Sequence, residues 1–328
     1  MLGLAALGGA AWPLLRGGTA TAAGDAGWDI VKIDGRDYIT GESIHKFYRF
    51  TTITKSGKSL VLRSPTLQLN ATAGSQELFI NRVKFILSDS AKQTKGTVAI
   101  SRMDLVKLVD PILRPSYIRT DRPFDTVIID PGHGGHDGGA PSIYGPEKNF
   151  ALDTGRKLRE LLTKRGYKVT MTREGDTYPS LPARVNLANK VPSAVFISIH
   201  FNSGQSAATG IETFALSPQG ATSTYESSKA TDARNFQGNA RDSENIALAT
   251  AIHASVLYNM SAAVDRGVKR ARFAVLRGIN KPAVLFEGGF LSNRGEARKI
   301  ATSAYRQTLA NAIADAVANY RKAITKKP

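Results

Sequence analysis

The chain has 328 residues, no cysteine, five histidines and a formal net charge of +17 at pH 7. The absence of thiols excludes a disulfide framework, a cysteine-ligated metal site and a cysteine nucleophile. The length is typical of about two domains, and a hydrophobic fraction of 42% supplies enough apolar residues for buried cores.

The basic excess is spread over both halves of the chain and is not packed into one basic arm. Such a charge fits a solvated basic surface, or an anionic partner such as nucleic acid, a membrane face or the bacterial cell wall. The chain has no basic helix and no aromatic RNA-binding motif, so a nucleic-acid partner is not expected.

Residues 2–15 form an uncharged apolar run that is followed by small residues. The run is too short to span a bilayer as a helix, and it is typical of the core of a secretory signal. Only Met1 precedes it, so the usual positively charged start is missing, and a buried apolar helix is the alternative. We predict a signal segment over residues 1–24 and an exported protein of the periplasm or cell envelope, without an integral membrane span.

Residues 25–118 alternate apolar and polar side chains over short segments separated by turns, which predicts a small β-rich accessory domain. One short helix is expected near residues 101–113, ended by Pro111 and Pro115. The strand–turn units resemble the copper-amine-oxidase-N-like domains of exported bacterial wall proteins. That resemblance implies no copper here, because the segment has one histidine and no other soft ligand. Residues 119–126 are predicted to be a linker.

From residue 127 the pattern changes to short apolar runs that alternate with helical segments, which predicts an α/β domain over residues 127–328. The expected architecture is an open, mostly parallel twisted sheet with helices on both faces. The expected strands are TVIIDPG, YKVTMTR, AVFISIH, GIETFAL, RFAVLR and PAVLFEGGF. Reactive residues in such sheets gather beyond the carboxyl ends of the strands.

Histidines and glutamates stand at these strand ends. His133 and His136 follow the first strand, and His200 closes AVFISIH. Glu147 opens the helix after a glycine-rich loop, and Glu287 ends PAVLFEG. Two imidazoles and a carboxylate form a zinc site with an open position for water, and a further carboxylate near that water could act as general base. The glycine-rich loop IIDPGHGGHDGGA lacks the ending of a P-loop, and it would let the chain fold tightly around an ion.

The same region contains IIDPGHGGHDGGA, GPEKNFALD, TREGD, ARVNLAN, FISIHFNS, GIETFAL, DRGVKRARFAVLR and PAVLFEGGFLSN, in that order. With these motifs, the stretch from Val127 to Ala318 resembles the zinc-dependent N-acetylmuramoyl-L-alanine amidases of the amidase-3 type. The resemblance implies one zinc ion per chain, held by His133, Glu147 and His200. It also implies hydrolysis of the amide between N-acetylmuramic acid and L-alanine of peptidoglycan by zinc-activated water, with Glu287 as general base.

Other polar residues carry two interpretations each. Asp130 and Asp137 would either orient the ligand imidazoles or bond backbone amides in the turn. Arg184 would either bind a peptide carboxylate or lie exposed on a helix surface. His136 could be a ligand, but a glycine loop does not fix both rings toward one point, so it is expected to support a ligand or to contact substrate. His253, in a helix rich in Ala, Ile and Leu, is expected to be structural.

The sequence says less about which residues contact the substrate. Arg266, Lys269, Arg270 and Arg272 would either grip substrate carboxylates or form a solvated basic face. The polar segment 217–245 is long for a connection and is predicted to be a mobile rim. Asn202 would contact substrate or cap a turn. We expect a monomer acting on peptidoglycan, with a regulatory or divisome protein as a further partner. The rival functions are another zinc-dependent cell-wall hydrolase, such as a peptidase or deacetylase, and a non-catalytic wall-binding protein.

Overall fold

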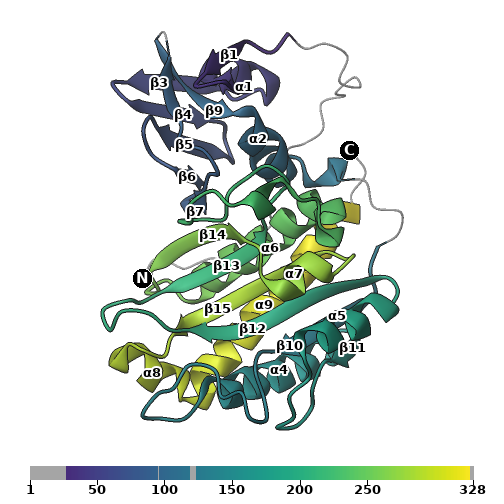
Figure 1. The fold of residues 1–328 in the computed structure, drawn as a ribbon. Helices are drawn as coiled ribbons and strands as arrows, with labels where there is room; N and C mark the ends of the chain where they lie inside the picture. Colours follow the sequence, from purple (N-terminus) through teal and green to yellow (C-terminus); the bar gives the residue numbers. More distant parts are fainter. Residues whose placement is uncertain (1–26, 95, 119–122, 326–328) are drawn as a thin grey trace, which may run out of the picture.

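The computed structural model describes residues 27–94, 96–118 and 123–325 (Figure 1). The predicted signal segment, residues 1–24, and residues 119–122 of the predicted linker lie outside the described residues. Within the part of the chain that the structure describes, no helix has both the length and the apolar character needed to cross a bilayer.

Residues 27–118, called the N-terminal part below, are rich in short antiparallel strands. Four strands form a small sheet in the order β1 (Ile30–Ile33), β2 (Arg36–Thr40), β9 (Thr97–Ser101) and β8 (Lys92–Thr94). Helix α1 (Gly41–Phe47) is followed by a meander of β3 (Thr52–Ser56), β4 (Ser59–Arg63), β5 (Gln68–Thr72), β6 (Glu77–Ile80) and β7 (Val83–Ile86). Leu60 and Leu62 of β4 and Leu69 and Ala71 of β5 are buried, and each pair has the period of two that predicted strands here.

The helix expected near residues 101–113 forms, but its end differs from the prediction. It consists of α2 (Arg102–Asp104), a π-helical turn η1 (Leu105–Val109) and α3 (Asp110–Leu113), and a 3-10 turn η2 (Pro115–Tyr117) follows. Pro111 therefore does not end the helix. It lies in the first turn of α3, directly after the π-helical turn. At a first helical turn the missing N–H of proline leaves no intrahelical bond unmade.

Residues 123–325, called the α/β part, form the rest of a large sheet. The sheet order is β11-β10-β12-β15-β13-β14-β7-β6-β5-β4-β3. Its first six members are β11 (Lys168–Met171), β10 (Thr126–Pro131), β12 (Ala194–Asn202), β15 (Ala283–Phe290), β13 (Ile211–Leu216) and β14 (Asp265–Ala271). These six strands pair in parallel except β13 and β15, which are antiparallel.

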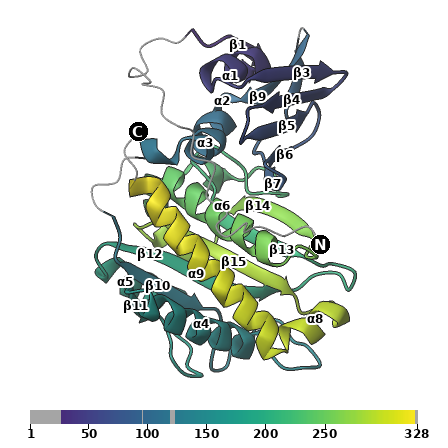
Figure 2. The ribbon, with the colours of Figure 1, turned by 180° about the vertical axis from the view of Figure 1, so that it is seen from behind.

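Helices cover both faces of the α/β part, so the predicted fold class is confirmed. One face carries α4 (Glu147–Lys164), α6 (Asp242–Asn259) and α9 (Ser303–Thr325), and the other carries α5 (Leu181–Lys190) and α7 (Ala274–Gly278) (Figure 1, Figure 2). The predicted last helix is divided into α8 (Arg294–Ile300) and α9. Successive side chains of β12 lie on opposite faces of the sheet: Val195 and Ile197 belong to one hydrophobic core and Phe196 to the other. His200 is an even number of positions from Phe196, so its side chain lies on the same face of the sheet, the one covered by α5 and α7.

The prediction of a strand at RFAVLR, residues 272–277, is wrong. Its apolar residues lie mostly in α7, where Val275 and Leu276 are buried. The strand beside β13 is the more polar DRGVKRA of β14. Its charges are compatible with a buried strand because each has a partner, with Glu212 bonded to Lys269 and Asp104 bonded to Arg270.

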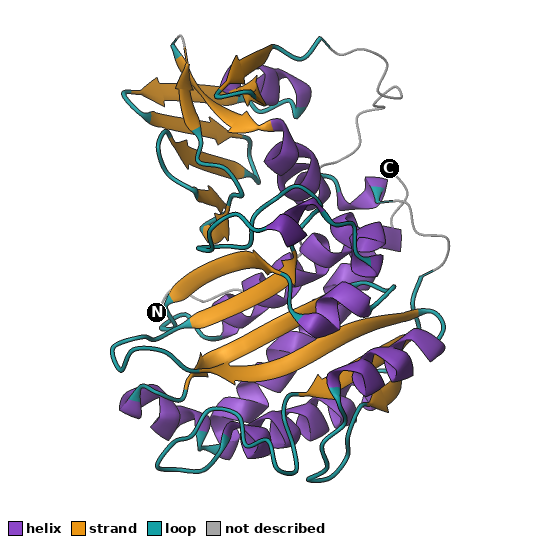
Figure 3. Ribbon diagram, viewed as in Figure 1, coloured by secondary structure: helices purple, strands orange, loops and turns teal. Residues whose placement is uncertain are grey.

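The N-terminal part joins the α/β part through strand pairing. β7 pairs in parallel with β14, with Phe85 opposite Val268. Beside this pair the backbone N–H of Lys84 donates to Asp265 Oδ2 at 2.8 Å. The strands of the two parts consequently follow one another in one sheet (Figure 3).

Buried charges reinforce this joint. Arg270, 2% exposed, donates from Nη1 to Asp104 Oδ1 at 3.0 Å and to Ser88 Oγ at 2.7 Å. Lys107 pairs with Asp242 at the start of α6, at 3.0 Å. Neither alternative for Arg270 is therefore right, because its side chain is neither solvated nor available to a substrate.

Candidate metal centre

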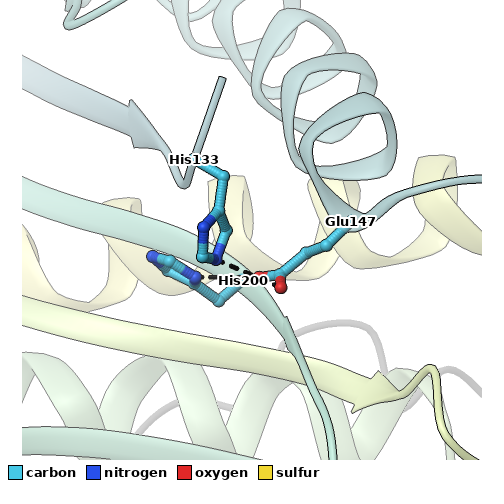
Figure 4. A group of neighbouring side chains, drawn as sticks. All are labelled: His133, Glu147 and His200. Atoms are coloured by element: carbon cyan, nitrogen blue, oxygen red, sulfur yellow. Dashed lines mark hydrogen bonds and ion pairs between the residues drawn. The ribbon is translucent and has the colours of Figure 1, made fainter. Parts of the chain in front are cut away.

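Three side chains that are far apart in the sequence meet at one point. His133 Nε2 lies 3.1 Å from Glu147 Oε2, and His200 Nδ1 lies 2.8 Å from Glu147 Oε1 (Figure 4). One ligand atom from each residue lies within 4.8 Å of the others. Across residues 27–94, 96–118 and 123–325, this is the one group of three or more histidines and carboxylates that meets that criterion.

The sheet topology brings the three residues together. β10 and β12 are parallel neighbours, so their carboxyl ends lie at the same edge, where His133 follows β10 and His200 lies near the end of β12. Glu147 is the first residue of α4. The loop before α4 folds back, with the N–H of Ala140 donating to Glu147 Oε2 at 2.8 Å.

The glycine-rich loop is tight because the ligands lie against it. A Cβ atom at Gly132 would overlap the ring of His200, and one at Gly139 would lie 2.6 Å from Glu147 Oε2. Gly139 also has φ +66°, which favours glycine. Larger residues at these positions would displace the ligands.

Asp137 performs both functions that the sequence left open for it. Its Oδ2 accepts from Nδ1 of His133 at 2.8 Å, and its Oδ1 accepts from the N–H of Gly139 at 3.1 Å. Burial raises the pKa of Asp137, but these two bonds outweigh it and hold the pKa below its ordinary value. A proton held on Nδ1 leaves the lone pair of Nε2 directed at Glu147, as a metal ligand requires.

The donor set fits zinc. Two imidazoles and one carboxylate form a common ligand set of catalytic zinc, and one ligand atom from each lies within 4.8 Å of the others. Glu147 is 4% exposed. Burial raises its pKa, but the bonds from His133 and His200 lower it far below the usual range, so the carboxylate is charged.

Glu287 adds a fourth acidic group. It is the register partner of His200 on the neighbouring strand β15, and it is 9% exposed. Its Oε2 is buried without a hydrogen-bond partner among the described residues. Burial, followed by the charges of Glu147 and Glu212, raises its pKa well above the ordinary value. An orphaned buried oxygen beside a ligand group indicates a polar species that belongs there.

Arg184 and Asp130 have a different role from the one expected. Arg184 is 3% exposed, and its Nη1 donates to Asp130 Oδ1 at 2.6 Å, while Nη2 donates to the carbonyl of His133 at 2.7 Å. Both interpretations of Arg184 are thus wrong, because it is neither exposed nor free to bind a peptide. Asp130 contacts no imidazole, and Thr172 and Ser198 also donate to it.

Arg173 is a functional residue that the sequence analysis missed. It is 3% exposed and donates to the carbonyls of Pro131 at 2.9 Å, Gly132 at 2.7 Å and Lys148 at 2.8 Å. Burial lowers its pKa to about 10. Its position in the motif TREGD, just after β11, the strand that pairs with β10, could have indicated that it lies near the site. Together with Arg184 it binds the carbonyls of residues 131–133, the segment that presents the first ligand.

The other histidines lie outside the ligand group. The ring of His136 packs against Tyr178, with centroids 4.3 Å apart. His253 is fully buried between Thr213 Oγ1 at 3.0 Å and Asp265 Oδ1 at 2.9 Å, which confirms its structural role.

The segment 217–245, predicted to be a mobile rim, is anchored to Arg272. It contains two 3-10 turns, η3 (Ala230–Ala233) and η4 (Gln237–Arg241). Arg272 pairs with Asp232 at 2.7 Å and donates to the carbonyls of Pro218 and Ala221. Arg272 is therefore an anchor of this segment.

Comparison with known proteins identifies the family. Residues 127–319, more than half of the chain, match the family described as N-acetylmuramoyl-L-alanine amidase. The chain belongs to this amidase family. The match starts at residue 127, so the predicted signal segment, the accessory domain and their boundaries remain predictions.

Individual amidases resemble part of the chain. The sporulation-specific N-acetylmuramoyl-L-alanine amidase of Bacillus subtilis is 37% identical over 187 residues, 56% of this chain and 63% of that protein. AmiA of Escherichia coli K12 is 33% identical over 217 residues, 59% of this chain and 75% of that protein. The structure of AmiC2 of Nostoc punctiforme covers 60% of this chain and 97% of its own, with 30% identity and a TM-score of 0.51. The chain spans 63% and 58% of the length of the first two curated relatives that it matches.

Proposed function

We propose that this chain is a zinc-dependent N-acetylmuramoyl-L-alanine amidase. It hydrolyses the amide between the lactyl group of N-acetylmuramic acid and L-alanine of the peptidoglycan stem peptide. The observation that carries the proposal is the group of His133, Glu147 and His200 beside the orphaned carboxyl of Glu287. All four residues lie within the region that matches the amidase family.

His133, Glu147 and His200 would hold one zinc ion per chain, which when bound supplies a Lewis acid that polarises a carbonyl and lowers the pKa of water. The protein prepares this site in advance. Asp137 fixes the tautomer of His133, and the buried Arg184 holds the carbonyl of the same residue. Fixed ligands reduce the reorganisation that binding would otherwise require.

Glu287 is the proposed general base. Its carboxylate takes a proton from the attacking water as the C–O bond forms, and returns that proton to the alanine nitrogen as the C–N bond breaks. Its burial suits the transfer, since a carboxyl whose pKa is raised holds the proton between the two steps.

We also propose that the protein acts outside the cytoplasm as a monomer, in the periplasm or cell envelope. The net charge of +17 supports attraction to an anionic wall. A protein regulator is supported by one relative, since the CwlD amidase of Clostridioides difficile has a structure in complex with the GerS lipoprotein.

Digestion of purified peptidoglycan, with the products identified by mass, tests the reaction. The expected products are free stem peptides beginning with L-alanine and glycan without peptides. The Glu287→Gln variant loaded with zinc is the matched control and should release neither. Cleavage between peptide residues would indicate a peptidase, and loss of acetyl groups a deacetylase; either result overturns the proposal.

A further inference from the structure

Four basic residues lie in β14 or directly after it, and they differ in how far they are exposed. Arg270 and Arg272 are engaged with Asp104 and Asp232. The side chain of Lys269 is 6% exposed, whereas that of Arg266 is 35% exposed. Of the four cations, Arg266 is the one that a substrate can reach.

A β-bulge directs Arg266 to its position. Between two register points, Ile211 opposite Asp265 and Thr213 opposite Val268, β13 advances two residues and β14 advances three. The extra residue lies next to Gly267, whose φ is +95°. Residues three apart in a regular strand point to opposite faces, and a bulge reverses this for one of them.

The consequence of the bulge is visible in the hydrogen bonds. Arg266 Nε and Lys269 Nζ both donate to Glu212 Oε1, at 2.5 and 2.6 Å. The two cations therefore converge on one carboxylate. One negative charge meets two positive charges, so this trio carries a net charge of +1, on the side where Arg266 is exposed.

Glu212 connects the trio to the metal centre. It is the register partner of Glu287 across β13 and β15. Its Oε2 accepts from Nδ2 of Asn202 at 3.0 Å, and Asn202 lies two residues beyond His200. Asn202 Oδ1 also accepts from the N–H of Ser203, at 2.7 Å.

The guanidinium of Arg266 is held in one plane. It lies over the ring of Phe290, 4.9 Å from its centroid, and its Nε is fixed by Glu212. Among the described residues its two terminal nitrogens have no hydrogen-bond partner. A guanidinium fixed in this way presents a planar pair of donors, the geometry that binds a carboxylate at both oxygens.

We propose that Arg266 determines substrate specificity by binding the first carboxylate of the stem peptide after L-alanine. This inference rests on the proposed amidase function. Because Arg266 is bonded to Glu212 on β13, it lies about two strand spacings, or about 10 Å, from β12, which carries His200. Two to three extended residues span about that distance. The stem peptide then runs from the scissile amide toward β14, and the glycan lies on the β10 side.

Two synthetic disaccharide peptides test this assignment. They differ in one group, the carboxyl of the residue after L-alanine, which is free in one and amidated in the other. The wild type should cleave the free acid with a kcat/KM about tenfold to hundredfold higher. Arg266→Gln should reduce this preference to below about threefold, chiefly through the KM of the free acid. Arg266→Lys, which keeps the charge without the fork, should give an intermediate preference.

Arg321→Gln is the matched control. Arg321 also stacks on an aromatic ring, 5.5 Å from the centroid of Tyr167, but it lies on α9 at the other face of the sheet. It should leave the preference at the wild-type value. Equal cleavage of both substrates by the wild type, or an unchanged preference in Arg266→Gln, overturns the inference while the amidase function stands. If neither substrate is cleaved, the amidase proposal itself fails.

Discussion

Two of the three proposed ligand side chains, His133 and Glu147, are held by further groups. Asp137 bonds His133, and the backbone N–H groups of Ala140 and Phe201 both donate to Glu147, at 2.8 and 3.0 Å. The ligands are consequently ordered by the protein's own contacts. A substitution in this group should therefore act on zinc binding and less on the fold.

The two histidines of the glycine-rich loop provide a direct comparison. His133→Ala should lower bound zinc from about one ion per chain to nearly none, because two ligands do not hold the ion firmly. His136→Ala should keep the zinc, since its ring packs against Tyr178. Metal analysis after dialysis measures both. Loss of zinc from His136→Ala alone would reverse the assignment.

Glu287→Gln should retain zinc and lower kcat by a factor of about 10²–10⁴, the usual contribution of a general base. Its effect on the stability of the metal-free protein should depend on pH. The folded state raises the pKa of Glu287, so the free energy of unfolding that this group contributes is fully present below its unfolded pKa and is lost as the pH rises.

The glutamine variant does not ionise, so the metal-free variant should be more stable than metal-free wild type at pH 8. The two should be equally stable near pH 4. Thermal unfolding at the two pH values checks the sign. A wild type that gains stability relative to the variant between pH 4 and pH 8 would contradict the raised pKa.

At the scale of elements, the loop after β10 depends on two buried arginines. Arg184 and Arg173 together bind the carbonyls of residues 131–133. These carbonyls belong to the end of β10 and the turn that follows it, where regular strand pairing stops. The arginines replace those missing bonds and so position His133.

Arg184→Met preserves much of the side-chain volume and removes the cation. It leaves Asp130, 1% exposed, without its charged partner, which should cost about 3–5 kcal/mol of unfolding free energy. Zinc affinity should also fall, because the carbonyl of His133 loses its donor. Urea unfolding and zinc titration measure the two effects.

Arg165→Met is the control for Arg184→Met. Arg165 pairs with Asp315 on the surface, where the two side chains are 35% and 47% exposed, so its loss should cost about 0–1 kcal/mol. Equal destabilisation by the two substitutions would show that Arg184 is not a buried anchor.

The sequence predicted strands well where apolar residues alone determine burial, as in β10, β12 and β15. It failed at β14 and α7. The apolar run of residues 273–276 favoured a strand, while DRGVKRA contains charges whose partners lie on other elements. Arg184 was misjudged for the same reason, because the burial of an arginine depends on acceptors that a single sequence does not place nearby.

At the scale of the whole molecule, the N-terminal part and the α/β part share a sheet and a buried ion pair. The residues of that pair, Asp104 and Arg270, are 166 positions apart in the sequence. No local pattern could have connected them, so the sequence analysis predicted two domains and no joint between them. The meeting of His133, Glu147 and His200 was easier to predict, because parallel strands bring their carboxyl ends to one edge.

Because the joint is buried, the two parts should unfold together, and calorimetry of the whole chain should show one transition. Asp104→Ala should lower the free energy of unfolding by about 3–5 kcal/mol by leaving Arg270 unpaired. Asp37→Ala removes the exposed pair with Arg102 and should change little. Two well-separated transitions in the wild type would contradict a shared cooperative unit.

The pairing of β7 with β14 has a consequence for how the protein behaves at high concentration. Without β7, β14 would expose unpaired N–H and C=O groups at the edge of the sheet, and such an edge can recruit strands from other molecules. β7 pairs with β14 at Val268, and further along β14 the backbone of Arg270 is bonded by Thr224. The edge strand of the large sheet is consequently β3. That strand is five residues long, and its exposed positions carry Thr52, Thr54, Lys55 and Ser56. A short polar strand with a lysine discourages edge-to-edge association, so removal of the N-terminal part is expected to make the remaining sheet more prone to aggregation.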